Sequence, residues 1–159
     1  EKDLSQSLKM EMMVITMIKI KRLRADAKLP SMSNPNDAGL DLHTTVSADI
    51  APMCRAKLPT GLAISIPVGM YGRIEGRSKL ANAFGIDTMG RIVDPGYRGE
   101  VMVSLINHGH KTIEFRAGDK VAQIIIQKHE SGMGILEVEY LDDTERGTSG
   151  INDTELRLK

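Results

Sequence analysis

Glycine and proline interrupt this chain at short intervals, and this punctuation limits the folds open to it more than any other feature. The chain contains 15 glycines and 6 prolines, spread almost evenly from Pro30 to Gly150. Between them lie short runs of β-branched and aliphatic residues, several with the two-residue period of a half-buried strand. These runs span residues 18–23, 62–66, 70–75, 101–107, 112–115, 121–126 and 135–140. Short strands divided by frequent turns predict an all-β barrel or sandwich.

One stretch, residues 77–84, has a helical rather than a strand pattern. Its sequence RSKLANAF places Ser78 where it could cap a helix, followed by the helix-forming residues Lys79, Leu80 and Ala81. Gly85 comes directly after it and is typical of a helix end. We therefore expect one short helix within the β-fold.

The length of 159 residues fits one domain with tails. We expect an N-terminal extension or added tail over residues 1–16 and a β-barrel domain over residues 17–143. The polar stretch over residues 144–159 contains two glycines and is expected to form a flexible C-terminal tail.

Charge and composition argue against several classes of protein. Lys plus Arg and Asp plus Glu both number 21, so a basic surface for nucleic acid or anionic membrane is not expected. Only 3% of the residues are aromatic, which is poor material for stacking on single-stranded bases. The apolar stretch over residues 10–20 is too short to span a bilayer. Cys54 is the one cysteine, which excludes a scaffold of internal disulfides. We place the chain inside a cell, most simply in the cytoplasm.

Two stretches could bind an anion or a metal ion. In AGLDL, residues 38–42, Asp41 alternates with apolar neighbours in a strand pattern, and on this pattern alone it could be a surface carboxylate. In GRSKLA, residues 76–81, Arg77 and Ser78 open the predicted helix, where backbone N–H groups favour phosphate. The alternative for this second stretch is an ordinary helix cap beside a solvated arginine.

Three further stretches carry candidate functional side chains. In IVDPGYRGE, residues 92–100, the Pro-Gly turn places Asp94 and Tyr97 together at a hairpin tip. Gln123 is the lone amide in an apolar strand and needs either a backbone partner or a place in a site. Arg146, in LDDTERG, lies beside glycine in the tail and could close over a phosphate as a lid does.

The order of these five stretches resembles the five motifs of the trimeric dUTP pyrophosphatases, the dUTPase family. The resemblance covers about residues 19–150, and YRGE, GRSKLA and GDKVAQ in this order are specific together. It implies a jelly-roll-like β-barrel that assembles as a homotrimer, with active sites between the subunits. It also implies hydrolysis of dUTP to dUMP and pyrophosphate with Mg²⁺, which limits uracil in DNA and supplies dUMP for thymidylate synthesis.

The resemblance also implies a role for each candidate residue. Asp41 would orient waters on a Mg²⁺ ion held by the substrate phosphates, and Asp94 would be the base that activates the attacking water. Tyr97 would pack under the deoxyribose and exclude a 2′-OH, while the hairpin over residues 85–93, including Gly90, would read uracil. The expected phosphate contacts are Arg77, Ser78, Lys79, Gln123 and Arg146.

The tail departs from the family pattern, because Ile151 stands where a phenylalanine is expected and Asn152 and Asp153 replace Gly-Ser. An isoleucine cannot stack on a base through a π-face, and Asp153 would repel a triphosphate. We therefore expect weaker substrate binding or a different lid geometry. This departure keeps open a dUTP-binding or regulatory protein with weak turnover. A dCTP deaminase is disfavoured, because Ser104 stands where that related family has its catalytic glutamate.

Overall fold

The computed structural model describes residues 17–130 and 132–148. The expected N-terminal extension over residues 1–16 lies outside the described residues, as do Ile151, Asn152 and Asp153 of the tail. In the described ranges, no helix is both long and apolar enough to cross a membrane.

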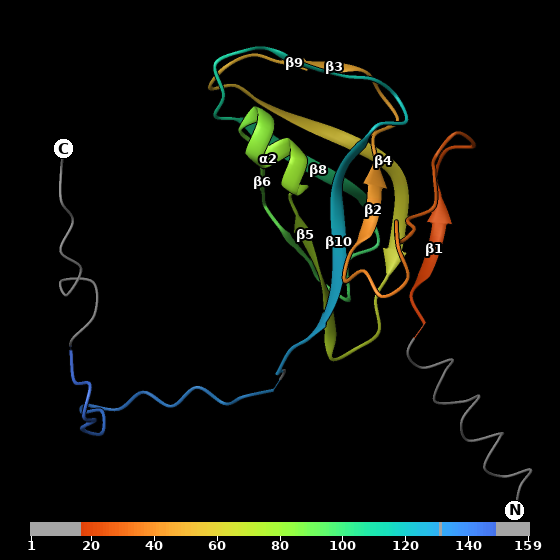
Figure 1. The fold of residues 1–159 in the computed structure, drawn as a ribbon. Coiled ribbons are helices and arrows are strands. Elements are labelled where there is room, and N and C mark those ends of the chain that lie inside the picture. The colour runs from red at the N-terminus through yellow and green to blue at the C-terminus, as the bar shows by residue number, and fades with distance from the viewer. Residues whose placement is uncertain (1–16, 131, 149–159) are drawn as a thin grey trace, which may run out of the picture.

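Two four-stranded antiparallel sheets and a two-stranded ribbon form a jelly-roll-like barrel (Figure 1), which confirms the predicted all-β fold. The first sheet has the order β1-β4-β8-β6, with β1 at Lys19–Arg22, β4 at Arg55–Ser65, β8 at Glu100–Asn107 and β6 at Ile86–Met89. The second has the order β2-β10-β5-β7, with β2 at Leu40–His43, β10 at Lys120–Lys128, β5 at Met70–Glu75 and β7 at Ile92–Val93. The ribbon pairs β3 at Ala48–Ile50 with β9 at Ile113–Phe115.

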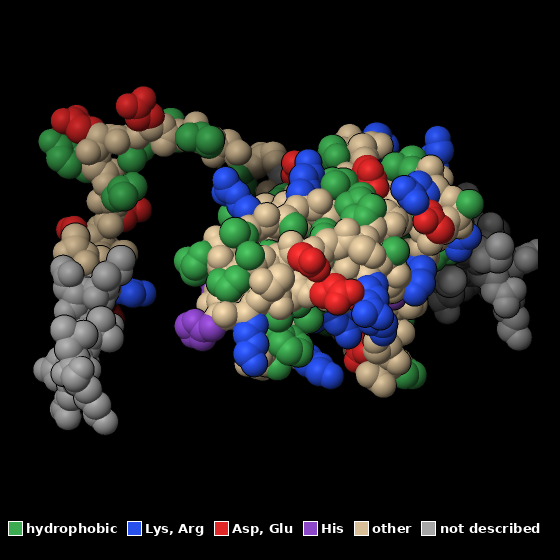
Figure 2. Space-filling view, turned by 90° about the horizontal axis from the view of Figure 1, so that it is seen from above, with side chains coloured by type: hydrophobic (Ala, Val, Ile, Leu, Met, Phe, Trp, Pro, Cys, Tyr) green, Lys and Arg blue, Asp and Glu red, His purple; other side chains and the backbone are tan. Residues whose placement is uncertain are grey.

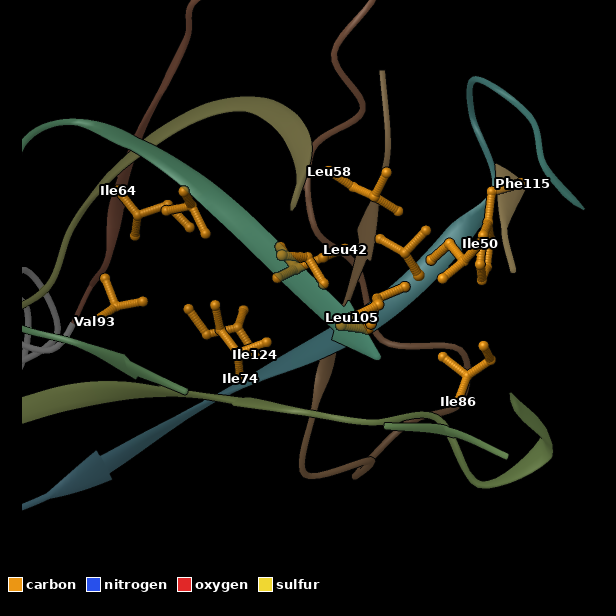
Figure 3. Close-up of a cluster of buried hydrophobic side chains, with 14 of the residues drawn as sticks. Leu42, Ile50, Leu58, Ile64, Ile74, Ile86, Val93, Leu105, Phe115 and Ile124 are labelled. Atoms are coloured by element: carbon orange, nitrogen blue, oxygen red, sulfur yellow. The ribbon is translucent and has the colours of Figure 1, made fainter. Parts of the chain in front are cut away.

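The core lies between the two large sheets. In β8 every second residue, beginning at Val101, is buried, as the alternation in the sequence predicts. Side chains from the opposite sheet meet this face (Figure 3), and Ile74 and Ile124 are at most 2% exposed. The buried faces are almost entirely aliphatic, so burial of apolar surface holds the sheets together.

The predicted helix is present as α2, Ser78–Phe84, but it is capped differently from the expectation. Arg77 is the N-cap residue and makes no side-chain cap hydrogen bond, whereas Ser78 is already the first helical residue. At the other end Gly85 adopts the left-handed conformation with φ 71°, and its N–H group donates to Ala81 and Leu80 carbonyls. The glycine stop was therefore predicted correctly, and the serine cap was wrong.

The strand expected at residues 135–140 is absent from the structure. This stretch lies within residues 132–148, which form neither strand nor helix and extend away from the barrel (Figure 1). Its apolar side chains are highly exposed, with Ile135 fully exposed and Leu136 and Tyr140 each 82% exposed. The residue pattern is that of a strand, but a strand also needs a hydrogen-bonding neighbour, which this segment lacks in the described chain.

Candidate functional site

Most of the candidate residues line two hollows of about 230 Å³ each. We call the first the Asp41 hollow; its lining residues are Ser33, Asp37, Gly39, Asp41, Arg77, Ser78, Lys79 and Gln123. We call the second the Asp94 hollow; its lining residues are Lys57, Ile92, Val93, Asp94, Tyr97, Glu100, Val101, Met102 and Ser104. Among the described residues, the two hollows have no lining residue in common.

Asp41 is buried rather than a surface carboxylate, which corrects the alternative left open by the sequence. It lies on β2, is 5% exposed, and accepts a hydrogen bond from Ser33 Oγ at 2.7 Å. Lys120 Nζ lies 2.6 Å from its Oδ2, and the Arg77 guanidinium pairs with its Oδ1. A buried carboxylate surrounded by two cations and a hydroxyl is a fixed part of the hollow.

These contacts determine the charge state of the site. Burial alone would raise the pKa of Asp41, but hydrogen bonds from Lys120 and Ser33 and the nearby positive charges outweigh it and lower the pKa. Asp41 therefore stays ionised at neutral pH. Burial lowers the pKa of His43, two residues along β2, and the charge of Lys28 lowers it further. His43 is therefore predominantly neutral at pH 7, so the positive charge around Asp41 comes from Arg77 and Lys120.

Gln123 lies on β10 directly between Asp41 on β2 and Glu75 on β5. Its amide Nε2 donates to the Gly76 carbonyl at 3.2 Å, and its side chain lines the Asp41 hollow. The backbone partner that the sequence left open is therefore present, and the place in a functional site stays a prediction. A Cβ atom on Gly39 would lie 2.2 Å from Gln123 Oε1, so the side chain occupies space that only glycine leaves free.

This close approach makes Gly39→Ala a test of Gln123. The Gly39 backbone has an ordinary negative or extended φ, so an alanine there strains only the Gln123 side chain. We expect kcat/KM for the substrate to fall by about 10²-fold, because displacements of about 1 Å in a positioned group cost that much. Steady-state kinetics of Gly39→Ala, Gln123→Ala and the double variant measure this. If Gly39→Ala lowers kcat/KM as much in the Gln123→Ala background as in the wild-type protein, the effect does not act through Gln123.

The start of α2 gives the Asp41 hollow its remaining polar groups. Ser78 and Lys79 line it, and Arg77 reaches Asp41 from the N-cap position. Arg77 is therefore ion-paired, which corrects the alternative of a solvated arginine. The lysine and arginine side chains, with Lys120 behind Asp41, make this hollow suitable for an anionic group that carries a counter-ion.

The second hollow is built on the turn that follows β7. The Tyr97 N–H donates to the Asp94 carbonyl at 3.1 Å, closing the Pro-Gly turn predicted from the sequence. Asp94 and Tyr97 both line the Asp94 hollow, where a carboxylate and a phenol ring therefore face the same space. The predicted turn is therefore present, but the expected hairpin is wrong, because β7 pairs with β5 while β8 pairs with β4 and β6.

The expected hairpin over residues 85–93 is open. Its first arm, β6, pairs with β8 in one sheet, while its second arm, β7, pairs with β5 in the other. Gly90 lies between the arms with φ 58°, a conformation that favours glycine. It lines a third hollow of about 400 Å³ that shares Lys57 and Ser104 with the Asp94 hollow. The hairpin and the Asp94–Tyr97 turn therefore border two adjoining hollows, which together we call the groove.

Sequence reasoning missed four residues that shape these hollows. Ser33 and Lys120 hold Asp41, and Lys57 joins the two parts of the groove. Arg91 fastens the open hairpin, since its guanidinium donates to Asp87 at 2.7 Å, to the Thr88 carbonyl at 3.1 Å and to Glu75 at 3.3 Å. Lys57 and Lys120 reach the site only through the pairing of distant strands, for which a sequence without a known register gives no signal.

Among the candidates that the structure describes, Arg146 alone lines none of the three hollows. It lies in a turn within the exposed segment of residues 132–148, which extends away from the barrel (Figure 1). Its expected part in phosphate binding therefore stays a prediction.

The sequence is similar to known proteins over most of its length. The model of the family described as dUTPase matches residues 25–155. The deoxyuridine 5′-triphosphate nucleotidohydrolase of Nocardia farcinica is 42% identical over 142 residues, covering 87% of this chain and 86% of that protein. The protein of the same name from Rhodococcus erythropolis is 45% identical over 136 residues, covering 84% and 82%. That from Arabidopsis thaliana is 39% identical over 136 residues, covering 86% and 81%.

Solved structures agree on the fold. The dUTPase of Staphylococcus bacteriophage 80alpha with dUPNHPP superposes with a TM-score of 0.80 at 21% identity, covering 88% of this chain and 99% of that one. A mutant dUTPase of phage phi11 of S. aureus, which coordinates a structural Mg(II) ion, gives a TM-score of 0.73 at 21% identity, covering 78% and 97%. With the family match and three relatives near 40% identity, this chain belongs to the dUTPase family.

Proposed function

We propose that this chain hydrolyses dUTP to dUMP and pyrophosphate inside the cell. The observation that carries the proposal is that the two hollows contain different kinds of side chain. The Asp41 hollow combines Arg77, Lys79 and Gln123, which suit a polyphosphate, while the Asp94 hollow offers a carboxylate base beside a phenol ring. A nucleoside triphosphate needs both kinds of surface, and relatives near 40% identity carry the name of this activity.

In the proposed reaction Asp94 orients a water molecule and accepts its proton. The water oxygen forms a bond to the α-phosphorus as the bond from that phosphorus to the bridging α–β oxygen breaks, and pyrophosphate leaves in line. Arg77, Ser78 and Lys79 hold the phosphates, and Gln123 contacts the α-phosphate or the water. Positioning and neutralisation of charge then supply most of the rate enhancement.

The residues present fit a magnesium ion that arrives with the substrate. A carboxylate offers about four acceptor positions, and three donors, Ser33, Lys120 and Arg77, already use Asp41. One position remains for a metal-bound water, which suits an ion that keeps most of its waters. The neighbouring cations oppose binding of free Mg²⁺, so the ion would be held jointly with the phosphates. Mg²⁺ supplies charge neutralisation when bound.

The open hairpin and Tyr97 account for the proposed choice of nucleoside. Because β6 and β7 pair with different sheets, backbone groups on their inner edges are available to read uracil. A tight fit there would exclude the 5-methyl group of thymine. Tyr97 would pack under the deoxyribose and leave no space for a 2′-OH. Ser104 lines this groove, and its hydroxyl lacks the acid–base capacity that a deaminase needs at that position.

We further propose a homotrimer whose active sites combine hollows from different copies. The exposed apolar side chains of residues 133–141 support an assembled form, because single-chain proteins rarely leave such a run uncovered. Figure 2 shows hydrophobic and acidic side chains along this extended segment. Strand β1 presents Lys19, Lys21 and Arg22 at the edge of the first sheet. On a neighbouring copy, these positive charges would complement the acidic side chains of the segment.

The mass in solution tests this assembly. A trimer of the 17.4 kDa chain has a mass of about 52 kDa, and light scattering coupled to gel filtration measures it. We expect the trimer mass at micromolar concentration. Changing Ile135 and Leu136 to serine should shift the protein toward smaller species, because it removes apolar surface available for the contact. The matched control is Val68→Ser, which is 92% exposed but lies outside the segment. A monomeric wild-type protein would contradict the proposal.

A four-substrate assay tests the activity itself. The protein is incubated with Mg²⁺ and, in separate reactions, with dUTP, dTTP, dCTP or UTP, and the release of monophosphate and pyrophosphate is followed. Selective formation of dUMP and pyrophosphate from dUTP supports the proposal. Binding of dUTP without turnover would favour a dUTP-binding or regulatory protein. Release of a deaminated product from dCTP would favour a deaminase.

A further inference from the structure

The Tyr97 side chain is folded back over the residues that follow it in the chain. Its hydroxyl donates to the Glu100 carbonyl at 2.9 Å, three residues along the chain. A Cβ atom on Gly99 would lie 2.4 Å from that hydroxyl oxygen and 2.6 Å from the ring carbon Cζ. Real Cβ atoms do not approach other atoms so closely, so the ring occupies the space that a side chain at position 99 would need.

Gly99 is needed for space and not for backbone conformation. Its φ lies outside the positive range that favours glycine, in contrast to φ 58° at Gly90. An alanine at position 99 is therefore compatible with the backbone. The atoms that it would meet belong to the far end of a side chain that is 46% exposed, so the ring can turn aside at small cost in stability.

The surface on which the ring rests is attached to the barrel. Glu100 begins β8, and its carboxylate Oε1 accepts a hydrogen bond from the Gly61 N–H of β4 at 2.7 Å. The carbonyl that receives the Tyr97 hydroxyl is thus held by the first sheet. The Tyr97 backbone, to which the ring is attached, is held by the turn that also carries Asp94. Two fixed points therefore determine the direction in which the ring faces the groove.

We propose that Gly99 is a positioning residue that sets the choice between deoxyribose and ribose by seating the Tyr97 ring. The inference rests on the proposed function, in which Tyr97 packs under the sugar. Because Gly99 has no side chain, the ring can lie against it and donate to the Glu100 carbonyl, in the position where a 2′-OH would meet it. When the ring is displaced, the space for a 2′-OH opens.

The test compares kcat/KM for dUTP and UTP in the full-length protein with Mg²⁺. We expect Gly99→Ala to lower the dUTP/UTP ratio by about tenfold or more, the discrimination that steric fit at one group provides. The matched control is Gly96→Ala in the same turn, where a Cβ meets nothing within 4 Å, and its ratio should stay at the wild-type value. Tyr97→Phe, which removes the hydroxyl contact alone, should give an intermediate ratio.

A double-variant cycle separates seating of the ring from other effects. In a Tyr97→Ala background, adding Gly99→Ala should leave the ratio unchanged, because no ring remains to be displaced. Thermal unfolding should show nearly equal stability for wild type and Gly99→Ala. An unchanged ratio in Gly99→Ala, or an equal loss in both backgrounds, overturns the inference while leaving the proposed function in place. A wild-type protein that does not hydrolyse dUTP overturns the proposed function, and the inference with it.

Discussion

Replacing Asp94 with asparagine is expected to lower kcat for dUTP by about 10²–10⁴-fold, the contribution of a positioned general base. Asparagine keeps nearly the same shape but cannot take a proton from the attacking water. Asp94 is exposed in the Asp94 hollow, so the substitution removes no buried contact, and folding should be preserved. KM should change by only a few-fold, because the lost interaction acts in the transition state. Steady-state kinetics with dUTP and Mg²⁺ measures both constants.

The matched control is Asp49→Asn. Asp49 is an exposed carboxylate on β3, opposite Glu114, and it lines neither hollow. Its substitution makes the same change of charge without touching the site, so kcat should remain near the wild-type value. If Asp94→Asn keeps wild-type kcat, or if both variants lose activity equally, Asp94 is not the base.

The largest effect on stability is expected for Ile124→Ala. Ile124 is fully buried on β10, opposite Leu40 on β2 and Ile74 on β5, at the centre of the second sheet. It also contacts the space above Gly72, where a Cβ would lie 2.8 Å from its Cδ1. Truncation removes apolar contacts and leaves a cavity, which costs about 2–5 kcal/mol of unfolding free energy.

Urea unfolding at one fixed protein concentration measures this loss, since the stability of an assembled protein depends on concentration. Ile124→Val removes one methyl group and should cost about 0.5–1.5 kcal/mol. Val68→Ala is the surface control, because Val68 is 92% exposed, and it should change stability by less than about 0.5 kcal/mol. Equal destabilisation by Ile124→Ala and Val68→Ala would contradict the described core.

The sequence predicts those parts of the fold that depend on local patterns. The strand expected at residues 70–75 is found with the same bounds, and that expected at 101–107 begins one residue earlier in the structure. Gly85 ends the helix as expected because the left-handed conformation at its C-cap favours glycine. The Asp94–Tyr97 pair is predicted because a single turn brings the two residues together.

The parts that fail depend on partners far along the chain. Residues 135–140 have a strand pattern, but the pattern does not state whether a neighbouring strand exists. Lys120 reaches Asp41 only because β10 and β2 pair in the observed register. The 85–93 hairpin is open because its two arms pair with strands of different sheets: β6 pairs with β8, and β7 pairs with β5. Local residue preferences hold no information on such pairings.

Because the Asp41 hollow and the Asp94 hollow share no lining residue, two inactive variants of this protein could restore activity to each other. In the proposed trimer, a copy damaged at Asp94 still carries an intact Gln123, and a copy damaged at Gln123 still carries an intact Asp94. Mixed trimers then contain some sites in which both residues are sound. Two inactive alleles of this protein would therefore complement one another in a single cell, whereas two alleles damaged in the same hollow would not.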